Sequence, residues 1–182
     1  MRKLMKKQLI MITALIMIFV LAACGSAEVD EYAQKYEGHG EVIDTGVIKG
    51  VCPTGWNSVD AYDLTKSSSE PLENALLFVK SGTGVDEDRP YIKIVYHKAN
   101  EEYEHPSAAD YDNALTIDSI STGSYVFEGF TAWSAGQQFV VLEAEAEKGT
   151  IDVWLWMHSG EEVSAAPTES DVLMILDSLV IL

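Results

Sequence analysis

The chain has 182 residues, a length that corresponds to about one domain. Hydrophobic residues make up 47% of the chain and charged residues 23%, which indicates a folded protein and excludes a highly charged disordered one. The 12 lysine and arginine residues are outnumbered by 29 aspartate and glutamate residues, for a formal net charge of −17. Because phosphate contacts need clustered basic side chains, this balance argues against a protein that binds nucleic acid.

The N-terminal segment has the pattern of an export signal. Arg2, Lys3, Lys6 and Lys7 precede a run of 15 uncharged residues, 9–23. That run is shorter than the ~20 apolar residues that span a bilayer, so a permanent transmembrane helix is the less favoured interpretation. We expect residues 1–23 to be a secretory signal peptide.

The residues Leu21-Ala22-Ala23-Cys24 resemble the lipobox of bacterial lipoprotein precursors. The resemblance implies that Cys24 carries lipid on its sulfur and becomes the first residue of the mature protein. The protein would then be anchored to the cell membrane by this lipid, with its domain on the extracytoplasmic face. Ordinary cleavage near Ala23, with Cys24 incidental, is the alternative.

The second cysteine, Cys52, has no intramolecular disulfide partner if Cys24 is lipidated. We expect Cys52 to be a small buried hydrophobic residue, with a reactive or intermolecular thiol as the alternative. Residues 24–40 are polar, acidic and flanked by glycine, which predicts a lipidated tether with a helical turn around Tyr32. Residues 41–182 are expected to form a single globular domain.

Within that domain the sequence favours strands. Turn signals separate short runs rich in β-branched and aromatic residues, and these predict strands within 42–51 and at 56–61, 75–80, 91–97, 124–133, 137–146 and 150–158. Pro53-Thr54-Gly55 predicts a turn, and the last two strands are expected to form a hairpin around Lys148-Gly149. Polar or acidic loops are predicted at 66–70, 81–84 and 86–90.

Two helices and a closing strand complete the prediction. A short helix is expected over 107–115, capped by Ser107 and Asp110. A capping box of Thr168 and Asp171 is expected to begin an amphipathic terminal helix, followed by a strand within 178–182. Strands with few helices predict an α+β domain, an antiparallel β-sheet covered by helices.

Three short signatures accompany this order of elements: Pro53-x-Gly55-Trp56, Gly129-Phe130-x-x-Trp133 and Ile175-Leu176-x-Ser178-Leu179. Together they resemble the PsbP-like family over about residues 41–182, which implies a PsbP-like α/β/α sandwich. A photosynthetic role is not implied, because one fold supports many functions. The chain also resembles small lipoproteins of clostridium-like bacteria, and that likeness implies no activity.

Aromatic residues are the first candidates for a binding site. Trp154 and Trp156 are expected to share one face of the strand at 150–158, because strand residues two apart do so. If the terminal helix packs on that face, the two indoles belong to the core, which is the interpretation we favour; if it does not, they line a groove. Trp133 is a third candidate, since indole rings form platforms for sugars, peptides and apolar ligands.

The segment HKANEEYEH contains the densest group of metal-capable side chains. His97, Glu101 and His105 are the candidate ligands, because imidazole with carboxylate suits zinc and similar ions. The spacing lacks the helical His-Glu-x-x-His pattern and Pro106 ends the run, so we favour a solvated acidic loop, with a metal site as the alternative.

We find no catalytic motif, such as the Gly-x-Ser-x-Gly elbow, and expect no cofactor. The sequence therefore favours a lipid-anchored extracytoplasmic binding or accessory module over an enzyme. Its expected partners are the membrane, through the lipid, and an envelope protein or small ligand. The alternative is a metal-dependent envelope enzyme or metal-binding protein that uses His97, His105 and the nearby acids.

Overall fold

The computed structural model describes residues 30–63, 70–81, 89–159, 162–163 and 165–182. The signal segment, Cys24 and most of the predicted loops at 66–70, 81–84 and 86–90 lie outside these residues. The chain divides into two compact units, 1–37 and 38–182. No helix in the described part of the chain is both long and apolar enough to cross a membrane.

The described end of the first unit holds helix α2 (Glu31–Lys35). The Asp30 side chain caps this helix by accepting hydrogen bonds from the backbone N–H groups of Tyr32 and Ala33. The helical turn that the sequence predicts around Tyr32 is therefore confirmed.

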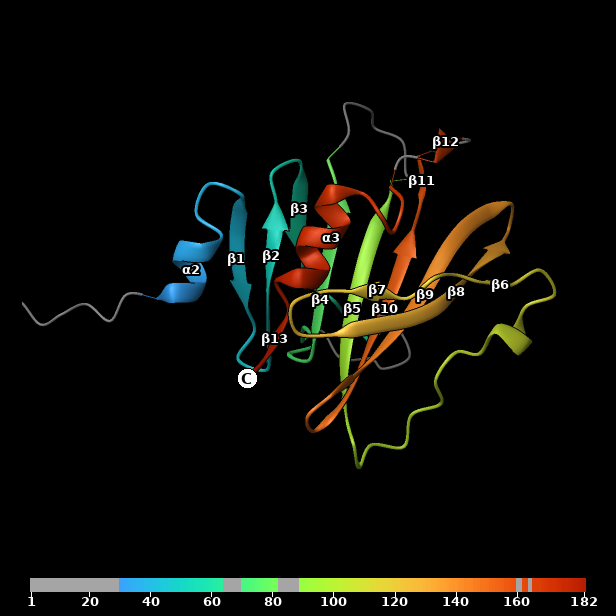
Figure 1. The fold of residues 1–182 in the computed structure, drawn as a ribbon, viewed down its shortest axis with the longest axis horizontal. Coiled ribbons are helices and arrows are strands. Elements are labelled where there is room, and N and C mark those ends of the chain that lie inside the picture. Colours follow the sequence, from blue (N-terminus) through green and yellow to red (C-terminus); the bar gives the residue numbers. More distant parts are fainter. Residues whose placement is uncertain (1–29, 64–69, 82–88, 160–161, 164) are drawn as a thin grey trace, which may run out of the picture. The chain divides into compact units, whose positions relative to one another are not determined.

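The second unit is built of antiparallel strands (Figure 1). A small sheet has the order β1 (Gly40–Asp44), β2 (Ile48–Pro53), β13 (Val180–Ile181). A larger sheet has the order β3 (Trp56–Val59), β4 (Ala75–Lys80), β5 (Tyr91–Lys98), β10 (Gly149–Trp156), β9 (Gln137–Ala146), β8 (Val126–Ser134), β6 (Leu115–Thr116). β7 (Ile120–Ser121) pairs with β8, and β11 (His158–Ser159) pairs with β12 (Glu162–Val163).

The predicted strands are confirmed, most closely where apolar residues run without a break. β4 has the predicted bounds, and β5 extends the prediction by one residue. β9 and β10 form the predicted hairpin; Ala146 pairs with Gly149, which places the two-residue loop at 147–148. The turn after Pro53 is also present, and Gly55 adopts a φ of 91°, a left-handed conformation that glycine allows at low cost.

The helical part of the fold prediction is wrong. The structure is a mainly-β fold, whereas an α+β sandwich with its sheet covered by helices was expected. In the described residues of the second unit, α3 (Ser170–Asp177) is the only α-helix. The α/β/α arrangement implied by the PsbP-like resemblance is therefore not present.

The predicted helix over 107–115 explains part of this error. Ser107 and Asp110 form the expected capping box, but the helix behind it is only the 3₁₀ turn η1 (Ala108–Asp110). Asp and Asn side chains compete with the backbone for hydrogen bonds, which disfavours a helix interior. The chain after the turn is instead held against β8, where the side-chain oxygen of Asn113 accepts a hydrogen bond from the Trp133 N–H and Leu115 pairs with Thr131.

Helix α3 exists, but it does not begin with the predicted capping box of Thr168 and Asp171. Its N-cap is Glu169, which makes no side-chain cap hydrogen bond. The Glu169 carboxylate instead accepts from the Ala166 N–H and lies 3.2 Å from Lys80 Nζ on β4. Glu169 at the start of the helix thus contacts a distant strand, and the sequence around residue 169 alone does not show this contact.

Strand β10 has neighbours on both edges and packed side chains on both faces. Ile151, Val153 and Leu155 are fully buried in the main core, which also contains Val172, Ile175 and Leu176 of α3. The opposite face of the sheet carries a second, smaller cluster: Phe130, Ala132, Phe139 and Val141, with Trp154, Trp156, Ala108, Tyr111 and Ala114 packed against it. β10 is therefore a central strand, with α3 packed on one face and residues of the segment 108–114 packed against the cluster on the other.

Candidate functional site

The register of the larger sheet sets out the side chains of this second face in rows. Directly paired residues on neighbouring strands point to the same side of a sheet. One row pairs Tyr91 with Trp156, and the next pairs Lys93 with Trp154. In the row after these, Val95 pairs with Asp152, Asp152 with Glu143, and Glu143 with Glu128. The face therefore changes from aromatic to acidic along the strands.

The aromatic rows border an open groove of about 1070 Å³. Trp154 and Trp156 are half-buried, and Phe139 supports both rings with centroid separations of 5.9 and 5.1 Å. Because α3 packs on the opposite face, the two indoles border a groove and are not part of the core beneath the helix. Other groove residues include Tyr62, Tyr91, Lys93, His97 and Tyr103.

Trp133, the third aromatic candidate, is not among the residues that line this groove. Its side chain is 44% exposed, and its ring lies 5.8 Å from that of His158, centroid to centroid. The structure thus brings Trp154 and Trp156 together and places Trp133 elsewhere on the sheet.

At the acidic end of the face, two of the three predicted metal ligands meet residues from distant strands. His105 Nδ1 lies 2.9 Å from Glu143 Oε2 and 3.1 Å from Asp152 Oδ1. His97 Nε2 lies 3.6 Å from the other Asp152 oxygen, Oδ2. We call these four side chains, His97, His105, Glu143 and Asp152, the His–carboxylate cluster.

The third predicted ligand, Glu101, lies on the outer side of the cluster. Its Oε2 atom is 3.9 Å from His97 Nδ1, the ring nitrogen that faces away from Asp152. Glu101 also accepts a hydrogen bond from the Lys98 N–H. This position suits a residue that orients His97 and does not suit a ligand in the same shell as His105.

Tyr103 lies between the two imidazoles. Its ring stacks on His97 at 3.6 Å with an interplanar angle of 12°, and it meets His105 edge-on at 4.9 Å and 87°. Burial raises the pKa of Tyr103 above its ordinary value, and the negative charge of Asp152 raises it further. Burial lowers the pKa of His97, an effect opposed by the carboxylates of Asp152 and Glu101. At neutral pH, His97 is therefore a neutral imidazole held flat against a neutral phenol.

Sequence reasoning missed Asp152 and Glu143. A weak signal was present, because Asp152 is a charged residue inside the otherwise apolar strand Thr150–Trp156. An aspartate with 1% exposure in a central strand needs a compensating partner. That signal could have identified Asp152, but not the histidines that the fold places beside it.

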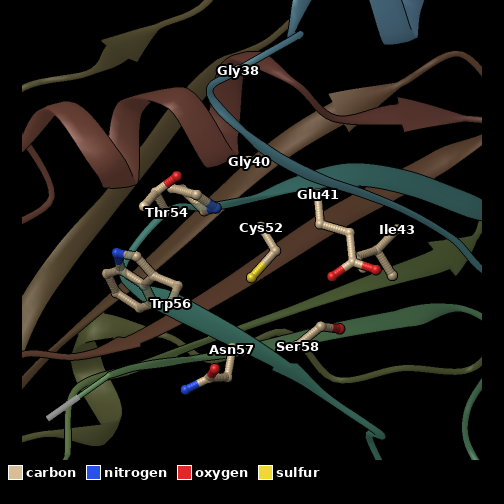
Figure 2. Close-up of a pocket in the computed structure, with 10 residues that line it drawn as sticks. Gly38, Gly40, Glu41, Ile43, Cys52, Thr54, Trp56, Asn57 and Ser58 are labelled. Carbon is tan, nitrogen blue, oxygen red and sulfur yellow. The ribbon is translucent and has the colours of Figure 1, made fainter.

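Cys52 lies beside a separate hollow of about 570 Å³, next to strands β1 to β3 (Figure 2). It is 5% exposed, so its interpretation as a buried residue is confirmed. Glu41 is its direct cross-strand partner. Burial raises the pKa of the Cys52 thiol to about 11, and the charge of Glu41 raises it further. A protonated thiol is a poor nucleophile, so Cys52 is not activated in this hollow.

Comparison with known proteins adds no relatives: no family model matches the chain, and no curated protein matches it either.

Proposed function

We propose that this protein is a lipid-anchored, extracytoplasmic binding module of a bacterial cell envelope. The N-terminal sequence supports the anchor, since a basic segment, a short uncharged run and a lipobox-like Leu21-Ala22-Ala23-Cys24 follow one another in the order of a lipoprotein signal. Acyl chains on Cys24 would hold the domain at the membrane without a second membrane segment.

The observation that carries the binding role is the groove on the second face of the larger sheet. Trp154, Trp156 and Tyr91 present aromatic surface there, and α3 packs on the other side of the same strands. Half-buried aromatic rings beside a few polar groups, such as Lys93, are typical of sites for small ligands. The ligand class that fits is a molecule with one flat apolar face, such as a saccharide or a short peptide.

The groove is tested with the full chain in detergent, titrated with N-acetylglucosamine oligomers and with a set of short capped peptides. We expect one of the two classes to raise the melting temperature and to bind with measurable heat. Trp156→Ala and Trp154→Ala should weaken that binding at least tenfold. Trp133→Ala is the matched control, because this indole is exposed outside the groove. Absence of binding by both classes, or binding that survives both groove substitutions, would overturn the assignment.

The anchor is tested separately in a bacterial host. Labelled palmitate should appear on the wild-type chain and not on Cys24→Ala, and the variant should leave the membrane fraction. Cys52→Ala is the control, since the only other cysteine should not affect labelling. An unlabelled wild-type chain, or a Cys24→Ala chain that stays in the membrane fraction, would contradict lipid anchoring.

A further inference from the structure

The acidic row of the sheet places three carboxylates on adjacent strands in direct register. Asp152 on β10 pairs with Glu143 on β9, and Glu143 pairs with Glu128 on β8. Like charges directly opposite one another destabilise a sheet. In the described part of the chain, the ion pairs of Asp152 and Glu143 are made with histidines and not with lysine or arginine. A cation near these oxygens would remove the repulsion.

Asp152 is the residue that most needs such a cation. Its side chain is 1% exposed, and its Oδ2 atom has no hydrogen-bond partner. The facing atom, His97 Nε2, is also buried and without a hydrogen bond, since the 3.6 Å that separates the two atoms is too long for one. Only the Oδ1 atom of Asp152 is paired, with His105, and a buried carboxylate oxygen left without a partner costs free energy unless it coordinates a metal.

The donor atoms have the separations that a small metal ion requires. One nitrogen or oxygen atom from each of His105, Glu143 and Asp152 lies within 4.8 Å of the others. Ligands at about 2.0–2.2 Å around a tetrahedral zinc ion stand roughly 3.3–3.5 Å apart. The distances of 2.9 and 3.1 Å from His105 Nδ1 to Glu143 and Asp152 are slightly shorter than that value, so a small outward movement of the side chains would admit the ion.

We propose that the His–carboxylate cluster binds one divalent first-row transition-metal ion of the Zn²⁺ class. His105, Glu143 and Asp152 are the ligands, and His97 lies beside the second oxygen of Asp152 as a positioning residue. An imidazole with two carboxylates favours such an ion over Ca²⁺ and Mg²⁺, which prefer oxygen ligands alone.

The surroundings of the cluster hold its ligands in place. Tyr103 fixes the plane of His97 by stacking and contacts His105 with its edge, so both imidazoles are oriented before an ion arrives. Glu101 lies beside the Nδ1 atom of His97, so it helps to orient this imidazole toward Asp152. Preorganised ligands lose less conformational entropy on binding.

The competing explanation is that a proton on His105 alone balances the site. A single imidazolium supplies one positive charge against the two carboxylates that it contacts, Glu143 and Asp152. It also leaves Asp152 Oδ2 without a partner, whereas a metal ion bound by this carboxylate would compensate its charge. The metal proposal is independent of the groove, because it holds whether or not a ligand stacks on the tryptophans.

The test is titration of the full chain, stripped with a chelator, with Zn²⁺ and then Co²⁺. We expect one Zn²⁺ per chain, and Co²⁺ should give the strong visible absorption of a four-coordinate site. Asp152→Asn and His105→Gln should each lower Zn²⁺ affinity at least tenfold. Ca²⁺ and Mg²⁺ at the same concentration should not compete.

Glu143→Gln and Glu145→Gln form the matched pair of the experiment. The two residues lie two apart on β9, share one face and are both exposed, so neither substitution threatens folding. Glu143→Gln should weaken Zn²⁺ binding, and Glu145→Gln should not. His39→Gln, at an exposed histidine, controls for adventitious imidazole binding. Absence of Zn²⁺ binding, or equal binding by Glu143→Gln and Glu145→Gln, would overturn the proposal.

Discussion

The two faces of strand β10 differ in how completely their buried groups are satisfied. On the α3 side, Ile151, Val153 and Leu155 have 0% exposure and only apolar neighbours to match. The one buried polar side chain of α3, Ser178 at its C-cap, uses its hydroxyl twice: it accepts from the Val51 N–H at 2.8 Å and donates to the Ile175 carbonyl at 2.8 Å.

On the other side, the same strand buries Asp152 with an unpaired oxygen and leaves two indoles half-exposed. The residues on the α3 side all contribute to the stability of the fold, because they bury apolar area and their buried polar groups form hydrogen bonds. Folding alone does not account for the second face, where buried polar atoms without partners reduce stability. The contrast separates residues that maintain the fold from residues retained for another role.

The strongest way to test this comparison is to substitute one residue on each face. Leu155 and Asp152 lie three apart on β10 and are equally buried. Leu155→Ala should lower the free energy of unfolding by about 2–5 kcal/mol, through lost burial and the cavity left behind. Asp152→Asn should cost less than about 1 kcal/mol in metal-free protein, because relief of charge repulsion offsets the lost contact with His105. Urea denaturation measures both. Equal costs would make Asp152 a structural residue.

Metal ions should then stabilise only a chain that keeps the second face intact. At a free Zn²⁺ concentration of 100 times its dissociation constant, the free energy of unfolding should rise by about 2.7 kcal/mol. With Zn²⁺ affinity lowered at least tenfold, Asp152→Asn should lose about half of this gain or more at the same Zn²⁺ concentration, and Leu155→Ala should retain it. Thermal unfolding with and without a chelator gives the comparison, which fails if Zn²⁺ stabilises wild type and Asp152→Asn alike.

Ser178→Ala examines the satisfied polar contact of the first face. The substitution leaves the Val51 N–H, which belongs to a fully buried residue, without its partner. A buried donor without a partner costs about 1–3 kcal/mol, so urea denaturation should show a free energy of unfolding lower by that amount. Ser170→Ala is the control, because this serine lies exposed at the start of α3 and its change should stay within about 0.5 kcal/mol. Similar losses in both variants would show that the Ser178 contact is not special.

The sequence predicted the strands and their alternating faces far better than the contacts that decide which face is covered by α3 and which carries the groove. β4 and β5 could be predicted because their apolar runs reflect burial directly, and Trp154 and Trp156 could be placed on one face by the alternation of a strand. The side on which α3 packs could not be predicted, since it depends on contacts such as that of Ser178 with Val51, 127 residues apart. In place of the helix predicted at 107–115, the chain is held against β8 through Asn113 and Leu115.

The candidate site shows the same limit. His97 and His105 stood out in the sequence as a local group, yet the carboxylates beside them come from β9 and β10, 38 to 55 residues further along the chain. Sequence spacing predicts partners on one element and not across a sheet. The signal peptide and the lipid on Cys24 stay predictions from the N-terminal sequence.

The smallest expected effect concerns Cys52. This residue belongs to the main core, so its thiol should be unreactive in the folded chain. With its pKa raised from 9.0 to about 11, the folded thiol should react with a disulfide reagent at pH 8 about 100-fold more slowly than in urea. Cys24→Ala makes Cys52 the sole thiol for this measurement.

The same shift sets a sign for the pH dependence of stability. Between pH 9 and about 11 the unfolded chain loses the Cys52 proton while the folded chain keeps it, so stability falls as pH rises through this window. Cys52→Ala should show a shallower alkaline loss than its parent, while the tyrosines with raised pKa values, such as Tyr91 and Tyr125, contribute equally to both. If the thiol reacts in the folded chain as fast as in urea, Cys52 is a reactive group within the main core. The main core would then contain more than residues that stabilise the fold, and the contrast between the two sides of the larger sheet would be wrong.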